Sequence, residues 1–91
     1  MTKDNEKYYE TYYIVTFQNT HEAMKAEREA IQNTIKVVVV PTPTYITKSC
    51  GISLKVTQEN IQSIIKLINS ENIKVKEIFV NDGESIKVMT I

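Results

Sequence analysis

The clearest pattern of hydrophobic and polar positions lies in the second half of the chain. Four isoleucines recur there at positions i, i+3, i+4 and i+7, namely Ile61, Ile64, Ile65 and Ile68. Residues with this spacing lie on one face of an α-helix. Thr57 can cap the start of this helix, and the polar stretch 69–72 ends it. The pattern therefore predicts an amphipathic helix whose isoleucine face packs against a core.

An earlier helix is predicted over residues 20–32. Asn19 can cap its start, with Glu22 three residues later as its partner in a capping box. The predicted buried stripe consists of Ala23, Met24, Ala26, the stem of Glu27, Ala30 and Ile31. Because three of these residues are alanines, we expect this helix to approach a sheet closely.

Strands are predicted where β-branched and aromatic residues are dense. These segments are 12–17, 35–40, 51–56 and 75–80. The second of them is followed by Pro41, which has no backbone N–H and is expected to stop the ladder of hydrogen bonds. The Asp82-Gly83 turn, followed by Ile86 and Val88, predicts a short returning strand.

The order of these elements is β-α-β-β-α-β with a small hairpin appended. This order predicts an α+β, ferredoxin-like, two-layer sandwich with an antiparallel sheet in the strand order 4-1-3-2. Residues 1–10 are expected to form a flexible tail, and residues 11–91 a single domain. In this topology residues 18–22 and the loop after Pro41 should meet at one end of the sheet, together with Cys50.

Composition narrows the classes of function. The 91 residues include 11 basic and 11 acidic ones, which gives no electrostatic case for binding nucleic acid or an anionic membrane surface. The longest apolar run, 37–40, is far shorter than a membrane span, and the first ten residues hold no apolar stretch of a signal peptide. We therefore expect a cytoplasmic protein with no nucleic-acid and no membrane partner. One cysteine excludes an internal disulfide and a multi-cysteine metal site, and neither a metal nor a cofactor is predicted.

The candidate chemistry is concentrated in the stretch PTPTYITKSCGISL, residues 41–54. Cys50 precedes Gly51 at the predicted junction of a loop and a strand, where a thiol is expected to be accessible. Lys48, and the N-terminus of the helix that begins near residue 20, would both favour the thiolate. His21 in the first turn of that helix is a candidate base or hydrogen-bond partner. The candidate binding residues are Pro41, Thr42, Pro43, Ser49 and Gly51.

The residues alone leave a plainer interpretation open. A lone cysteine is more often a small buried hydrophobe than a nucleophile. A lone histidine in the first turn of a helix is usually a solvated surface residue. Spacing by itself therefore favours an inert Cys50 over a reactive one.

Several segments resemble a small bacterial family named putative Se/S carrier protein-like. They are 13–17, 20–24 with Ala26 and Glu27, 40–43 and 49–54, and the resemblance extends over about residues 12–80. Its most specific parts are the Cys50-Gly51 step and the proline loop before it. The resemblance implies that Cys50 carries sulfur or selenium, as a persulfide or selenide, between donor and acceptor proteins. Thr44-Tyr45 stands where the resemblance leads us to expect a basic residue, so an anionic partner would be bound differently here.

Two functions follow, from different classes. The first is a thiol carrier in which Cys50 takes sulfur or selenium from one protein and passes it to another. The alternative is a non-catalytic interaction or regulatory module that forms a homodimer. A hydrolase or transferase is less favoured, because one cysteine and one histidine supply no third orienting group. We therefore expect a carrier or binding protein rather than a turnover enzyme.

Overall fold

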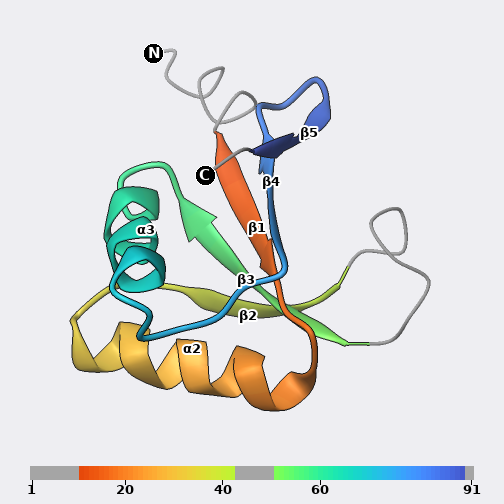
Figure 1. Ribbon diagram of the computed structural model, residues 1–91. Coiled ribbons are helices and arrows are strands. Elements are labelled where there is room, and N and C mark those ends of the chain that lie inside the picture. Colours follow the sequence, from red (N-terminus) through yellow and green to blue (C-terminus); the bar gives the residue numbers. More distant parts are fainter. Residues whose placement is uncertain (1–10, 43–50, 90–91) are drawn as a thin grey trace.

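The computed structural model describes residues 11–42 and 51–89, and these form two helices and five strands (Figure 1). The elements are β1 (Tyr12–Thr16), α2 (Thr20–Gln32), β2 (Val38–Pro41), β3 (Ile52–Thr57), α3 (Ile61–Asn69), β4 (Glu77–Asn81) and β5 (Ile86–Met89). The strands form one antiparallel sheet in the order β2-β3-β1-β4-β5. The predicted α+β class is confirmed. The predicted tail 1–10 lies outside the described residues.

One face of the sheet carries the core. Val15 of β1 is paired with Leu54 of β3 and with Ile78 of β4, so the three side chains share a face. All three are 0% exposed and belong to a cluster that also holds Ala26 of α2 and Ile64 of α3. Both helices therefore cover the same face, and Figure 1 shows them on one side of the sheet.

The predicted bounds of α2 are confirmed, and its start is capped as expected. The Asn19 side-chain oxygen accepts a hydrogen bond from the backbone N–H of Glu22 at 2.9 Å. The second bond of the predicted capping box does not form. Instead Oε1 of Glu22 is buried without a hydrogen-bond partner among the described residues.

The buried stripe of α2 is narrower than predicted. Ala23, Ala26 and Ala30 are each 0% exposed, whereas Met24 is 52% and Ile31 is 64% exposed. The three alanines lie at i, i+3 and i+7, and this line alone faces the sheet. The prediction of a close approach through alanine is confirmed, and the prediction that Met24 and Ile31 are buried is wrong.

The predicted start of the second strand is also wrong, because Ile35 belongs to the end of α2. The N–H of Ile35 donates to the carbonyl of Ala30 at 2.8 Å, and the N–H of Thr34 donates to the carbonyl of Ile31 at 3.0 Å. Thr34 has a φ of 60°. This pair of bonds and the left-handed residue between them form a Schellman motif. The second strand, β2, therefore begins only at Val38.

The start of α3 also differs from the prediction. Thr57 does not cap the helix, because it is the last residue of β3 and pairs with Tyr12. Asn60 occupies the cap position, and its side-chain amide donates to Oγ1 of Thr57 at 3.0 Å. The hydroxyl of Thr57 therefore supports the turn between β3 and α3.

The apolar face of α3 is rotated relative to the predicted stripe. Ile61, Ile64 and Leu67 are buried, while Ile65 and Ile68 are half-buried and pack against the edge of the core. Leu67 lies three residues after Ile64 on the same helical face. The isoleucine pattern therefore predicted the helix correctly. It predicted the buried face only in part, because Leu67 lies at the centre of that face and Ile65 and Ile68 lie at its edge.

The returning strand β5 is confirmed, and the turn before it is built on Asp82. One carboxylate oxygen of Asp82 accepts hydrogen bonds from the N–H groups of Glu84 at 2.9 Å and Ser85 at 3.0 Å. These two hydrogen bonds hold the pKa of Asp82 below its ordinary value, and the bond from Glu84 has the larger effect. Gly83 in the same turn has a φ of 95°, a conformation that glycine adopts without strain.

We expect this turn to make stability depend on pH below about 4. Because the folded state lowers the pKa of Asp82, the stabilisation is complete above the ordinary aspartate pKa and is lost as pH falls through the lowered value. Asp82→Asn keeps an oxygen acceptor but cannot titrate. The loss of melting temperature between pH 5 and pH 3 should therefore be slightly smaller in Asp82→Asn than in the parent. An equal loss in both proteins would show that the turn carboxylate does not contribute.

Candidate functional site

The candidate site lies at the end of the sheet where β1 ends and β3 begins. These two strands are antiparallel neighbours, so the chain leaving Thr16 and the chain entering Ile52 lie close together. β4 also begins at this end, since the N–H of Lys76 donates to the carbonyl of Thr16 at 2.8 Å. α2 starts four residues after β1, and its N-terminus brings a partial positive charge to the same end.

Pro41 does not stop the ladder as predicted. It is the last residue of β2 and pairs with Ile52, and one further bond follows, from the N–H of Thr42 to the carbonyl of Gly51 at 3.0 Å. Because hydrogen-bonded and non-hydrogen-bonded pairs alternate in an antiparallel ladder, the backbone of Pro41 faces the free edge of the sheet. A missing N–H costs no ladder bond there.

A pair of hydroxyls lies beside this last pair of residues. Oγ1 of Thr42 and Oγ of Ser53 are 2.6 Å apart, and Ser53 is 0% exposed. One hydrogen lies between the two oxygens, so the second hydroxyl hydrogen can be donated to another acceptor. Ser53 was not among the predicted site residues. Its only signal in the sequence is that it lies two positions after Gly51, on the same face of the strand.

Gly51 is exposed and is not forced to be glycine by the described residues. A Cβ atom added there would meet Oγ1 of Thr42 at 3.8 Å, an ordinary contact. Its backbone does not have a positive φ. Within the described residues, nothing in the fold therefore requires glycine at this position.

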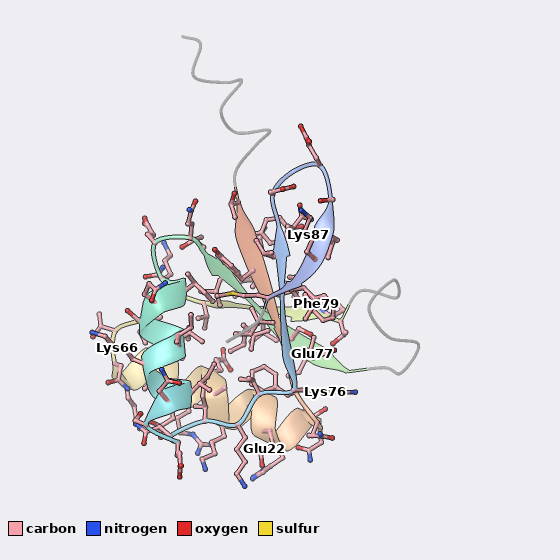
Figure 2. All side chains as sticks on the ribbon, turned by 45° about the horizontal axis from the view of Figure 1, so that its top comes forward. Glu22, Lys66, Lys76, Glu77, Phe79 and Lys87 are labelled. Atoms are coloured by element: carbon pink, nitrogen blue, oxygen red, sulfur yellow. The ribbon has the colours of Figure 1, made fainter. Side chains whose placement is uncertain are left out.

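His21 is the second residue of α2 and is exposed. It lies at the same end of the sheet as Gly51 because α2 follows β1 directly. Lys76 adds a cation at this end, and Figure 2 shows it where β4 begins, close to the start of α2. Lys76 was not predicted as a site residue. Its position follows only from the sheet topology, which makes β4 start where β1 ends.

The remaining predicted site residues lie outside the described residues. They are Cys50, Lys48, Ser49 and Pro43. Among the described residues, the structure brings Pro41, Thr42 and Gly51 together by backbone pairing. His21 lies at the same end of the sheet but is not joined to these three described residues by a hydrogen bond.

The described residues lack the features of two other kinds of site. In the segments 11–42 and 51–89, no group of three or more His, Cys, Asp or Glu side chains is arranged to hold a metal ion. The same part of the chain contains no helix with the length and apolar character needed to cross a membrane.

Comparison with known proteins identifies a family. Residues 12–80 match the family model described as "Putative Se/S carrier protein-like". No curated protein and no solved structure matches significantly. The matched segment runs from the first residue of β1 to the penultimate residue of β4, and it includes the hydroxyl pair, Gly51 and Cys50. The chain therefore belongs to the putative Se/S carrier protein-like family.

Proposed function

We propose that the protein carries sulfur or selenium on Cys50 between a donor and an acceptor protein. The observation that carries this proposal is the family match over residues 12–80, which includes the Cys50-Gly51 step. The exposed Gly51 directly after the cysteine supports it, because two docking partners need open backbone beside the thiol. A carrier of this kind would work in the cytoplasm, where thiols stay reduced.

The transfer is a thiol exchange with a persulfide. The Cys50 thiolate attacks the terminal sulfur of a donor persulfide, and the donor cysteine leaves as a thiolate. Cys50 then holds the persulfide, and an acceptor thiolate removes its terminal sulfur by the same reaction. Selenium would follow the same course, with a terminal selenium atom in place of the terminal sulfur.

Several groups favour this chemistry in the proposal. The N-terminus of α2 and Lys48 stabilise the thiolate, and His21 is the candidate proton acceptor. The Thr42–Ser53 hydroxyl pair has one hydrogen left to donate beside Gly51. A terminal sulfur anion on the neighbouring residue is an acceptor of suitable charge for that hydrogen.

The test is intact-mass measurement after incubation with a cysteine desulfurase and free cysteine. The wild-type protein should gain the mass of one sulfur atom, and reduction with dithiothreitol should remove it. Cys50→Ser should gain nothing. In protein that has not been treated with the desulfurase or free cysteine, iodoacetamide should alkylate Cys50 at neutral pH faster than it alkylates a free cysteine peptide, because more of the thiol is ionised. Lys48→Ala and His21→Ala should slow this alkylation without unfolding the protein.

A relocated thiol supplies the matched control. Ser85 lies in the exposed turn before β5, at the opposite end of β4 from Lys76. The double variant Cys50→Ser/Ser85→Cys therefore presents one exposed cysteine away from the candidate site. Loading of this variant as fast as the wild type would contradict the proposal, as would alkylation of Cys50 no faster than the peptide.

A second candidate function is a homodimeric interaction module, and the face of the sheet opposite the helices favours it. Among the described residues, both helices pack on the face that carries Val15, and none packs on the other face. Val38 and Val88, on that other face, are 54% and 58% exposed. These two valines stand on the two edge strands of one face, and exposed apolar residues at the rim of such a face are available to contact another protein.

We also propose that the fold is ferredoxin-like. The support is that β2, β3, β1 and β4 are neighbours in that order, which is the 4-1-3-2 order in reverse, with β5 added outside β4.

A further inference from the structure

A row of five side chains crosses the face of the sheet opposite the helices. The register of the strands places one residue of the row on each strand: Val38 on β2, Lys55 on β3, Ile14 on β1, Phe79 on β4 and Val88 on β5. Directly paired residues share a face, and this row alternates with the core residues Val15, Leu54 and Ile78. We call these five residues the cross-strand row.

The cross-strand row is apolar except at one position. Val38 and Val88 at its two ends are more than half exposed, Phe79 is half-buried, and Ile14 at its centre is 5% exposed. Lys55 is exposed, and its Nζ lies 4.5 Å from the centre of the Tyr12 ring on the same face. Figure 2 shows Phe79 and Glu77 on the side of β4 away from α3.

The order of residues in the row is nearly symmetric about Ile14. Valines stand at both ends, and a cation and an aromatic ring stand at the two positions between the ends and the centre. A two-fold axis parallel to β1 would bring Val38 against Val88 of a second copy and Lys55 against Phe79 of that copy. A lysine over an aromatic ring is a favourable contact. The axis would pass over Ile14, which is already 5% exposed within one copy and adds little contact area. The row is thus complementary to itself, as a two-fold interface requires.

Charge on this face also suits a second copy. Lys55 and Glu77 lie on it with opposite signs, on the two strands that flank β1. Two identical faces therefore meet without net repulsion. A partner of strongly acidic or strongly basic character would find no matching excess of charge.

We propose that a second copy of this chain covers the face opposite the helices, with the two cross-strand rows facing each other about a two-fold axis parallel to β1. The inference rests on the homodimeric role proposed above and not on the carrier chemistry. The two sheets then pack face to face at about 10 Å, the usual spacing.

The first test is the mass in solution, by light scattering and sedimentation equilibrium at tens of micromolar. The wild type should have twice the monomer mass. Val88→Asp should raise the dissociation constant at least about a hundredfold, because an unpaired carboxylate would be buried at the interface. Ile31→Asp is the matched control, since Ile31 is exposed to a similar extent, 64%, but lies on α2. It should remain a dimer.

The second test determines which residues face each other. In a Cys50→Ser background, Val38→Cys/Val88→Cys should be joined into covalent dimers by a bismaleimide whose span is about 10 Å. Within one copy the two positions are four strand spacings apart, about 19 Å, so the reagent cannot join them. Neither single variant should form the dimer efficiently, because each position faces the other one across the axis.

Each result decides the proposal. A monomer mass for the wild type overturns it, whatever else covers the face, and so does a dimer that Val88→Asp leaves intact. Efficient cross-linking of Val38→Cys alone would contradict the proposed direction of the two-fold axis, because it would place Val38 opposite its own equivalent. Loading of Cys50 by a desulfurase is measured separately. A dimer that is not loaded would contradict only the carrier proposal, and a loaded monomer would contradict only the dimer proposal.

Discussion

Replacing Ile64 with aspartate should lower the melting temperature of the protein by tens of degrees. Ile64 is 0% exposed and packs in the core between α3 and the sheet. A carboxylate at this position loses its hydration and gains no partner, which costs about 4–5 kcal/mol or more. A domain of this length has a free energy of unfolding of roughly 5–14 kcal/mol, at about 0.05–0.15 kcal/mol per residue. The substitution should therefore remove a large part of this stability. At about 4–8 °C for each kcal/mol, the melting temperature measured by circular dichroism should fall by roughly 15–40 °C.

Ile31→Asp makes the same chemical change on the surface of α2. Its side chain is 64% exposed, so the free energy of unfolding should change by no more than about 0.5 kcal/mol. Ile65→Asp, at a half-buried position, should fall between the two. A melt of Ile64→Asp within a few degrees of the parent would contradict the packing of α3 on the sheet.

The second large effect is expected from Ala26→Leu. Ala26 is 0% exposed and belongs to the line of alanines through which α2 contacts the sheet. Additional methyl groups in a packed core force neighbouring side chains or the backbone to move, at a cost of about 1–3 kcal/mol. In a domain of this size the melting temperature should fall by roughly 4–8 °C for each kcal/mol.

Met24→Leu is the control for that substitution. Met24 lies on the same helix and is 52% exposed, so the change should be nearly neutral. A parent-like or higher melting temperature for Ala26→Leu would mean that α2 has room beneath it. Its alanines would then have to be explained by helix propensity rather than by close approach.

The two helices could be predicted because they depend on local periodicity. The isoleucines of α3 and the alanines of α2 each mark one helical face. The ends of the helices were harder, since each ends in a Schellman motif with Thr34 or Glu71 at the left-handed position. The usual signal at that position is glycine, and the chain has only two glycines. Ile35 therefore looked like a strand residue, although it closes the helix before it.

The candidate site could be predicted where it depends on chain order and not where it depends on register. The position of His21 and Gly51 at one end of the sheet follows from the sequence of elements alone. The contact between Thr42 and Ser53 depends on which residues of β2 and β3 stand opposite each other. A shift of one residue in the pairing would place Ser53 on the other face. No pattern within either strand determines that pairing, so the hydroxyl pair could be found only in the structure.

The outward-facing backbone of Pro41 has a consequence for aggregation. Four consecutive valines, 37–40, form the kind of β-branched, uncharged segment that readily stacks into amyloid. Most of that segment lies on an edge strand, where free N–H and C=O groups can template another chain. Along β2 the residues that direct these groups outward are Val39 and Pro41, and Pro41 has no N–H to offer. A strand from another molecule could therefore form only a broken ladder here, which protects an otherwise sticky sequence from growing into a fibril.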